Sequence, residues 1–251
     1  LFRSIKISTG ASTQKRLVVE NKQFSLANSL ESRSLGLVVH KDQKKGSASI
    51  NTVTEEGVKR AIESALALAK YSVPDENLTL PGPDLAPKAK PLAFLYDDDL
   101  AKVELGEIQA VMQEVLARLT RDKRVALDRY EMSVDVSYHG LANSLGVRQS
   151  ERQTMAHWSF FGMGRNGEEV TGFDYDGSFS LKRADMLPKS MDDAGRFVDK
   201  IVKALGPVKC PTYKGAVLLS PRAVQELVYG MIHYHMGGRQ VMDGKSRWEK
   251  A

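Results

Sequence analysis

The sequence predicts an α+β fold in which clustered antiparallel or mixed β-sheets pack with a few amphipathic helices. Short segments rich in β-branched residues are grouped within residues 4–50 and 130–169 rather than placed singly between helices. Two turn signals in the second group, NSLG and RNGEE, are typical of antiparallel hairpins. A doubly wound parallel sheet would alternate single strands with single helices, so that architecture is not expected.

The composition indicates a globular protein for which neither a membrane nor a nucleic acid is the expected partner. Of the 251 residues, 42% are hydrophobic and 27% are charged. No stretch approaches the roughly 20 apolar residues of a membrane-spanning helix. The single cysteine, Cys210, cannot form an internal disulfide, which agrees with a reducing cytoplasm. The net charge is +5, and its one basic cluster, residues 40–46, is either a phosphate or RNA contact or, the favoured interpretation, a solvated hairpin tip.

An N-terminal α+β unit is expected in residues 1–75. A helix is predicted to follow residue 51, because Thr52 and Glu55 fit a capping box and Glu55 and Glu56 lie where the helix dipole favours acids. Apolar residues recur at helical spacing from Val58 to Ala69. Strands are predicted at residues 4–9, 16–24, 34–40 and 45–50, with a turn at residues 41–45.

A proline-rich linker is expected in residues 76–96 and a middle α+β unit in residues 97–210. Five of the nine prolines fall within residues 72–94, which excludes a regular helix or a central strand there. The middle unit is predicted to contain helices at residues 103–122 and 192–205 and strands at residues 130–140 and 141–164.

Residues 211–251 are expected to begin a C-terminal domain. Residues 216–219, AVLL, predict a buried strand, and the following helix has Ser220 as its cap and Pro221 at its first position. Because the sequence starts at Leu1 and stops shortly after a helical segment, we expect an N-terminal fragment of a longer chain, with this domain truncated.

The segment MIHYHMGGRQ, residues 231–240, contains the most conspicuous candidate metal ligands, His233 and His235. On a helix their side chains point roughly 200° apart and cannot bind one ion. A catalytic zinc usually takes three protein ligands, and the familiar helical motif places two histidines four residues apart beside a glutamate. We therefore predict neither a metal site nor a catalytic residue in this chain, and keep the two histidines as weak alternative ligands.

The other candidate residues favour structural roles. FDYDG, residues 173–177, lacks the later ligands of a calcium loop and favours a turn at a strand end. The acids of residues 97–99 are more typical of a helix start than of an acid/base pair. Cys210 has no histidine nearby in the sequence, and His157 and Trp158 are expected in the core or at its rim. Substrate-binding residues are not identified by any motif.

Several segments, taken in order, resemble the TldD/PmbA family, also called modulators of DNA gyrase. The likeness is strongest in residues 33–75, where a glycine-containing strand pair leads into a helix that starts with TVTEE and ends with ALALAK. It continues in ANSLGV, residues 142–147, and in the strand and helix of residues 214–228. The resemblance covers nearly all of the chain and implies a TldD/PmbA-like α+β fold.

The resemblance also implies which branch of the family this chain is similar to. In the TldD branch, the helix after this last strand carries a zinc motif of His-Glu, three residues and His. The corresponding positions here are Val228, Tyr229 and His233. Valine has no lone pair to donate, and a tyrosine phenol cannot replace a carboxylate base at neutral pH. The chain therefore resembles the PmbA/TldE branch, which lacks the motif and accompanies a catalytic subunit.

A function follows from this resemblance as an expectation. It implies a non-catalytic subunit of a cytoplasmic zinc metallopeptidase complex that processes or degrades peptides and unfolded proteins. The expected partner is a TldD-like catalytic subunit or a homo-oligomer, with a peptide as substrate and zinc held by the partner rather than by this chain. Two alternatives stay open: a self-sufficient metallopeptidase with atypical ligands, and a regulator of gyrase or DNA, which would need a basic patch that the sequence does not show.

Overall fold

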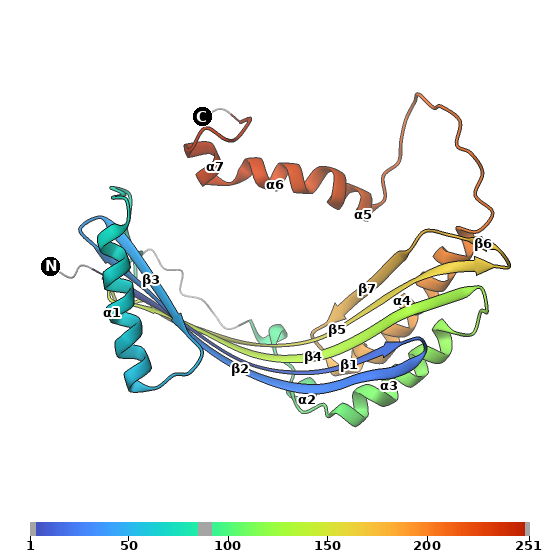
Figure 1. Cartoon of the computed structure of the whole chain (residues 1–251), viewed down its shortest axis with the longest axis horizontal. Coiled ribbons are helices and arrows are strands. Elements are labelled where there is room, and N and C mark those ends of the chain that lie inside the picture. Colours follow the sequence, from blue (N-terminus) through green and yellow to red (C-terminus); the bar gives the residue numbers. More distant parts are fainter. Residues whose placement is uncertain (1–3, 85–91, 249–251) are drawn as a thin grey trace. The chain divides into compact units, whose positions relative to one another are not determined.

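The computed structural model describes residues 4–84 and 92–248, and divides the chain into two compact units, Leu1–Pro207 and Val208–Ala251. The first unit contains a seven-stranded antiparallel sheet and several helices (Figure 1). The predicted α+β class with an antiparallel sheet is therefore confirmed.

Two long hairpins form most of the sheet. The first joins β1 (Ser4–Glu20) to β2 (Gln23–Lys41), and the second joins β4 (Val125–Asn143) to β5 (Arg148–Asn166). These strands are longer than the usual 3–10 residues. The prediction of separate strands at residues 4–9 and 16–24 was wrong, because Asn21 and Lys22 adopt positive φ angles and form the hairpin turn inside the second of these segments.

Three shorter strands complete the sheet. They are β3 (Lys44–Ile50), β6 (Glu169–Val170) and β7 (Asp174–Ser180). The strand order is β3-β2-β1-β4-β5-β6, with β7 also paired to β5. Because β1 pairs with β4, the ranges predicted as an N-terminal and a middle unit contribute neighbouring strands to one sheet. Part of the predicted linker, residues 85–91, lies outside the described residues.

The main helices of this unit are α1 (Glu55–Tyr71), α3 (Leu105–Leu119) and α4 (Arg183–Lys203). The cap of α1 is Thr54, whose side chain accepts a hydrogen bond from the Gly57 amide, in place of the predicted Thr52. Helix α4 begins nine residues earlier than predicted, and its first half contains Pro188, a residue type that usually interrupts a helix. Proline removes one helical hydrogen bond, but the buried side chains along α4 hold the helix against the sheet. The short elements η1 (Ala93–Leu95) and α2 (Asp98–Ala101) precede α3.

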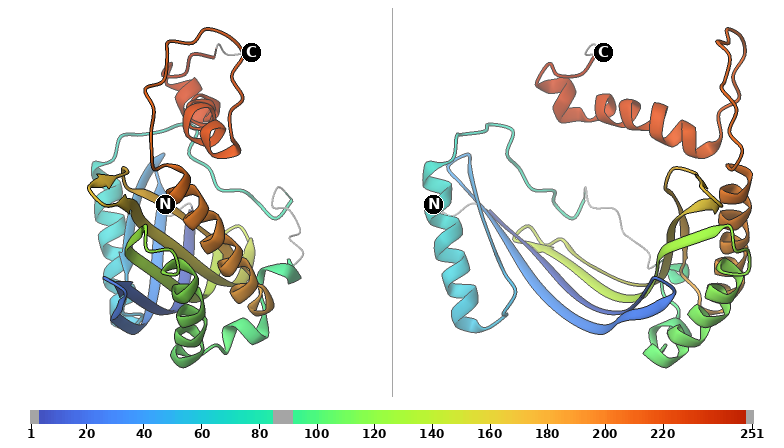
Figure 2. Two further views of the ribbon diagram at one scale, coloured as in Figure 1. Left: turned by 90° about the vertical axis from the view of Figure 1, so that its right-hand side faces the viewer. Right: turned by 45° about the vertical axis from the view of Figure 1, so that its right-hand side comes forward.

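All three long helices cover the same face of the sheet, which is its outer, convex side (Figure 2). Odd-numbered residues of β1 point to this face: Ile5 and Ile7 pack with α1, whereas Leu17 and Val19 belong to the core beneath α3 and α4. The large side chains at the centre of that core are Trp158, Tyr130, Phe160 and Phe197. The concave face carries no helix from the described part of this unit.

The second unit contains a helix that runs through α5 (Pro221–Val224), a π-helical turn η2 (Gln225–Tyr229) and α6 (Gly230–Met236), followed by α7 (Gly238–Met242). Ser220 caps its start and Pro221 occupies the first position, as predicted. The predicted buried strand at residues 216–219 is wrong: this segment is irregular, and Leu218 is fully exposed. A strand needs a hydrogen-bonded neighbour, and residues 208–248 supply none. No helix in the described ranges has the length and apolar character needed to cross a bilayer.

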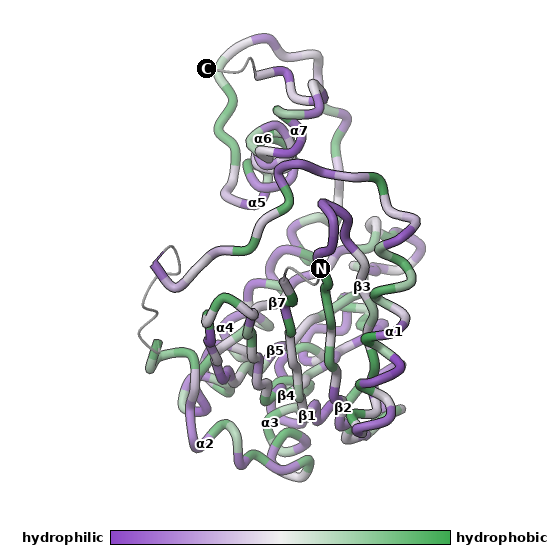
Figure 3. Tube along the Cα trace, turned by 90° about the vertical axis from the view of Figure 1, so that its left-hand side faces the viewer, coloured by the Kyte–Doolittle hydropathy of each residue, from purple (hydrophilic) through white to green (hydrophobic). Residues whose placement is uncertain are grey.

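A close approach of backbones joins α1 to β3. Helix α1 alternates hydrophobic and hydrophilic stretches along its trace (Figure 3), and its buried stripe consists of small residues, Ala61, Ala65 and Ala69. Opposite them lies Gly46 of β3, where an added Cβ would be 1.8 Å from the Ala65 carbonyl oxygen. The helix can therefore lie directly on the strand only because residue 46 has no side chain.

We predict that Gly46→Ala lowers the free energy of unfolding by about 1–3 kcal/mol, because α1 must move away from β3 to make room for the methyl group. Gly106→Ala is the matched control, since nothing lies within 4 Å of a Cβ added there. Urea unfolding of both variants and the wild type measures the difference. Equal midpoints for Gly46→Ala and the wild type would contradict the packing argument.

Candidate functional site

The positions that correspond to the zinc motif lie on the helix of the second unit. Val228 and Tyr229 are in the π-helical turn, and His233 is one turn later in α6. Val228 and His233 are five positions apart, which in a regular α-helix would place their side chains about 140° apart around the axis. A π-helical turn contains more residues per turn, so this angle is different here. Such turns are frequent at functional sites. The helix thus has an unusual backbone at this place, but only one of the three positions carries a side chain suited to bind zinc.

The two histidines have separate surroundings. The His233 ring lies against the Tyr229 ring, with centroids 5.7 Å apart, whereas the His235 ring meets the Tyr234 ring edge-on. The Nδ1 atom of His235 accepts a hydrogen bond from the Arg247 amide at 3.1 Å. Among the residues that the structure describes, no group of three or more His, Cys, Asp or Glu side chains is arranged to hold a metal ion. The donor set at residues 228, 229 and 233 does not fit a zinc ion.

The concave face of the sheet carries a network of polar side chains across β1 and β4. Gln14 donates to Asp135 at 2.6 Å, and the Ser133 hydroxyl donates to the same carboxylate at 2.8 Å. Two residues further along β1, Arg16 donates a hydrogen bond to Glu131 at 2.7 Å. These side chains can reach one another because they lie on the same face of the sheet. Gln14 stands directly opposite Asp135, and Arg16 is diagonal to Glu131.

The carboxylate of Glu131 is the charged centre of this network. Burial by itself would raise the pKa of Glu131, but hydrogen bonds from Arg16 and Arg129 outweigh it and hold the pKa below its ordinary value. Arg129 also contacts Glu20 at the end of β1, at 2.7 Å. Around Glu131, two arginines therefore face two glutamates, Glu131 and Glu20, and the nearby Asp135 carboxylate adds a further negative charge to the network on the open face.

Aromatic side chains lie at the β5–β7 side of the same face. The rings of Phe161 and Phe173 are stacked, with centroids 4.9 Å apart. On β7, Tyr175 and Phe179 are 56% and 55% exposed, and Phe179 stands opposite His157. Polar groups with fixed hydrogen bonds next to exposed aromatic rings can bind both the backbone and the apolar side chains of an extended peptide.

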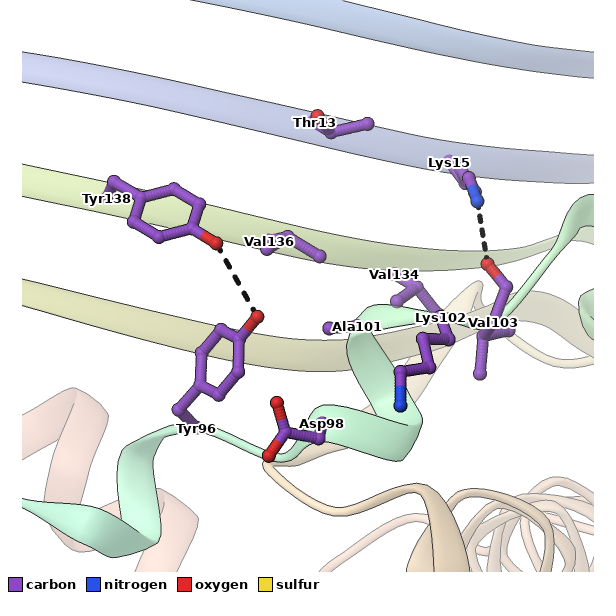
Figure 4. A pocket seen from close by; sticks show the side chains of 10 residues that line it. All are labelled: Thr13, Lys15, Tyr96, Asp98, Ala101, Lys102, Val103, Val134, Val136 and Tyr138. Carbon is purple, nitrogen blue, oxygen red and sulfur yellow. Dashed lines mark hydrogen bonds between the residues drawn. The ribbon is translucent and has the colours of Figure 1, made fainter.

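A cavity of about 340 Å³ lies on the opposite, convex face, between η1, α2 and the middle of the sheet (Figure 4). The hydroxyl groups of Tyr96 and Tyr138 are 3.5 Å apart, and this hydrogen bond, followed by burial, raises the pKa of Tyr96. Lys15 donates to the Val103 carbonyl at 2.9 Å. The Lys15 ammonium group thus already has partners within the protein. The cavity lies beside the place where α2 packs on β4 and β5.

The other candidates from the sequence have structural environments. Asp97 caps α2 by accepting from the amides of Asp99 and Leu100, which confirms the helix-start interpretation of residues 97–99. Asp174 is in strand β7, not in a turn, and pairs with Lys200 at 3.0 Å. Trp158 is buried and donates to Asp193, whereas its neighbour His157 faces the concave side. Residues 40–46 span the β2–β3 turn, and Cys210 is an exposed free thiol.

Comparison with known proteins identifies similar chains. Residues 10–69 match the family model described as PmbA/TldA metallopeptidase domain 1. The chain is 29% identical over 217 residues to the "Metalloprotease PmbA homolog" of Haemophilus influenzae, covering 84% of this chain and 45% of that protein. The chain spans about half the length of the curated relatives it matches.

Solved structures share the fold. TldE from Thermococcus kodakarensis is 25% identical, with a TM-score of 0.64, and the match covers 80% of this chain and 44% of that one. A Bacteroides thetaiotaomicron protein described as a modulator of DNA gyrase has a TM-score of 0.73 at 18% identity, covering 83% of this chain and 47% of that one. At 18% identity, the match to the Bacteroides protein shows a shared fold alone.

The network around Glu131 gives a pH-dependent prediction. Because its pKa is depressed in the folded state, the ionised carboxylate stabilises the fold above its ordinary pKa of 4.5, and this contribution is lost as the pH falls through the lower folded-state value. Glu131→Gln should therefore lower the free energy of unfolding by about 1–2 kcal/mol at neutral pH. The difference from the wild type should shrink on acidification below pH 4.5.

Urea titrations at neutral and acidic pH measure this difference. Glu63→Gln, at an exposed position of α1, is the control and should change stability little at either pH. A loss for Glu131→Gln that is the same at both pH values would show that the charge is not responsible.

Proposed function

Because the chain belongs to the PmbA/TldD family, we propose that it is a non-catalytic subunit of a cytoplasmic zinc metallopeptidase complex. The observation that carries the proposal is the donor set of the helix in the second unit. Val228 has no lone pair and Tyr229 has no carboxylate, so zinc and the catalytic base belong to a TldD-like partner. The complex would process or degrade peptides and unfolded proteins.

The contribution of this chain would be peptide binding on the concave face of the sheet. The polar network at Gln14 and Asp135 offers fixed donors and acceptors, and the exposed rings of Tyr175 and Phe179 offer apolar surface. A peptide held in an extended conformation presents side chains alternately, so it can contact both kinds of group at once. This face therefore supports a role in holding the substrate rather than cutting it.

The two alternatives gain no specific support from the geometry. A self-sufficient metallopeptidase would need at least one further ligand close to His233, and His235 directs its Nδ1 atom to the Arg247 amide instead. A DNA-binding regulator would need an extended basic surface, whereas the arginines of the concave face are paired with Glu131 and Glu20.

Reconstitution tests the division of labour. A TldD-type catalytic subunit and this chain are purified, dialysed against zinc-free buffer, analysed for bound metal, and assayed separately and together on an unfolded protein. The mixture should cleave after zinc is restored, the chain alone should not, and zinc should be found with the catalytic subunit. Cleavage by the chain alone, or near-stoichiometric zinc bound to it, would refute the proposal.

A pair of variants tests the peptide-binding face. Phe179→Asp should raise the KM of the reconstituted complex about tenfold and leave kcat nearly unchanged, because it replaces apolar contact surface with a charge. Leu68→Asp on α1 is the matched control, since both side chains are 55% exposed and only Phe179 lies on the concave face. Equal KM values for the two variants would place the peptide elsewhere.

A further inference from the structure

The cavity on the convex face is lined by two opposite charges that do not pair with each other. Asp98 belongs to α2 and Lys102 is the residue that ends it, so the two stand four positions apart in helical backbone. Both side chains are exposed and line the cavity (Figure 4). Among the residues that the structure describes, neither of them forms an ion pair, whereas Lys15, the other cation of the lining, pairs with Glu104 at 2.9 Å.

These two charges are neighbours on the helix surface. Side chains four residues apart on a helix have their Cβ atoms about 5–6 Å apart, and an acid and a lysine at this spacing often form an ion pair. Asp185 and Lys189 of α4 are the same residue types at the same spacing, and they pair at 2.8 Å. The charges of Asp98 and Lys102 are therefore close enough for one small molecule to contact both of them.

The rest of the lining offers apolar surface and a hydroxyl donor. The apolar part comes from Val134 and Val136 of β4 and from Ala101 of α2. The hydroxyl groups of Tyr96 and Tyr138, 3.5 Å apart, share one hydrogen bond. Each hydroxyl carries one hydrogen and this bond uses only one of the two, so the pair keeps one hydrogen that it can donate to a ligand.

Interactions with the sheet hold this lining in place. The guanidinium group of Arg152, on β5, lies 4.0 Å from the centre of the Tyr96 ring. The next residue along the chain, Asp97, donates its amide to the Thr154 hydroxyl at 3.0 Å, which fixes the start of α2 on the same strand. A lining that is ordered before a ligand enters loses little conformational freedom on binding, and this favours affinity for a small molecule.

We propose that this cavity binds a free α-amino acid with an aliphatic side chain. Asp98 binds the ammonium group, Lys102 and the tyrosine pair bind the carboxylate, and the side chain lies against the valines of β4. In an α-amino acid both charged groups are attached to one carbon atom, which suits two protein charges one helical turn apart. A ligand with a single charge would leave Asp98 or Lys102 unmatched, and a dipeptide separates its terminal charges by a further residue. The volume of about 340 Å³ is at the lower end for ligand pockets, as expected for so small a ligand.

An NMR titration of the isotopically labelled chain with L-leucine tests both the binding and its place. The backbone amide signals of residues 98–103 should shift and saturate at millimolar L-leucine. N-acetyl-L-leucine and L-leucinamide each lack one charge, so their dissociation constants should be about tenfold higher or more, the effect of losing one hydrogen bond between charged groups. Glycyl-L-leucine, whose charges are further apart, should also bind more weakly. Because the cavity lies on the face opposite the proposed peptide-binding surface, this test does not depend on the proposed function.

Substitutions at the two charges complete the test. Asp98→Asn and Lys102→Gln should each raise the dissociation constant for L-leucine about tenfold or more, because one charge of the ligand loses its partner. Asp99→Asn is the matched control and should leave it unchanged, since Asp99 is an exposed acid of the same helix that does not line the cavity. The absence of saturable shifts at residues 98–103, or equal affinity for L-leucine and its two blocked derivatives, would overturn the proposal. Tighter binding of glycyl-L-leucine than of L-leucine would overturn the assignment to a free amino acid.

Discussion

The pairing of β1 with β4 is the contact on which the rest of the first unit depends. It runs from Lys6 opposite Asn143 to Glu20 opposite Arg129, and it joins two hairpins that are far apart in the sequence. A slip of one residue would turn Leu17 and Val19 out of the core, since neighbouring residues face opposite sides. The register that builds the core also places Gln14 opposite Asp135. Stability on one face and the candidate binding surface on the other thus have the same origin.

Features that depend on neighbouring residues could be predicted from the sequence. Ser220 and Pro221 start a helix through their own side-chain and ring chemistry, and the turn of residues 143–146 lies between the strands it was expected to join. Thr52 has the capping-box spacing to Glu55, whereas the observed cap, Thr54, has Gly57 at the corresponding position, so the spacing pattern pointed two residues too early. The first half of α4 could not be predicted because it contains Pro188. The packing that offsets the lost helical hydrogen bond involves residues of the sheet that are distant in the sequence.

The candidate binding surface could not be predicted because it depends on register between strands. Arg16 and Glu131 are separated by more than a hundred residues and meet only when β1 and β4 pair. His157 and Trp158 were considered together, yet they point to opposite faces of β5, one to the open side and the other into the core. An alternation of small polar residues in β1 was the available signal, but it identifies a face without identifying its partners.

Packing of the second unit's helix against another surface would not make residues 228, 229 and 233 better zinc ligands. Many large apolar side chains of its helix are exposed within residues 208–248, including Leu227, Met231 and Ile232, and a helix with so much apolar surface is typical of one that packs against another surface. Such packing would bury Val228 more deeply. Burial makes a site without donor atoms less favourable for an ion, because the ion would lose its hydration and gain no ligand. Association can therefore give this helix a structural role, but it does not make the side chains of residues 228, 229 and 233 fit a zinc ion.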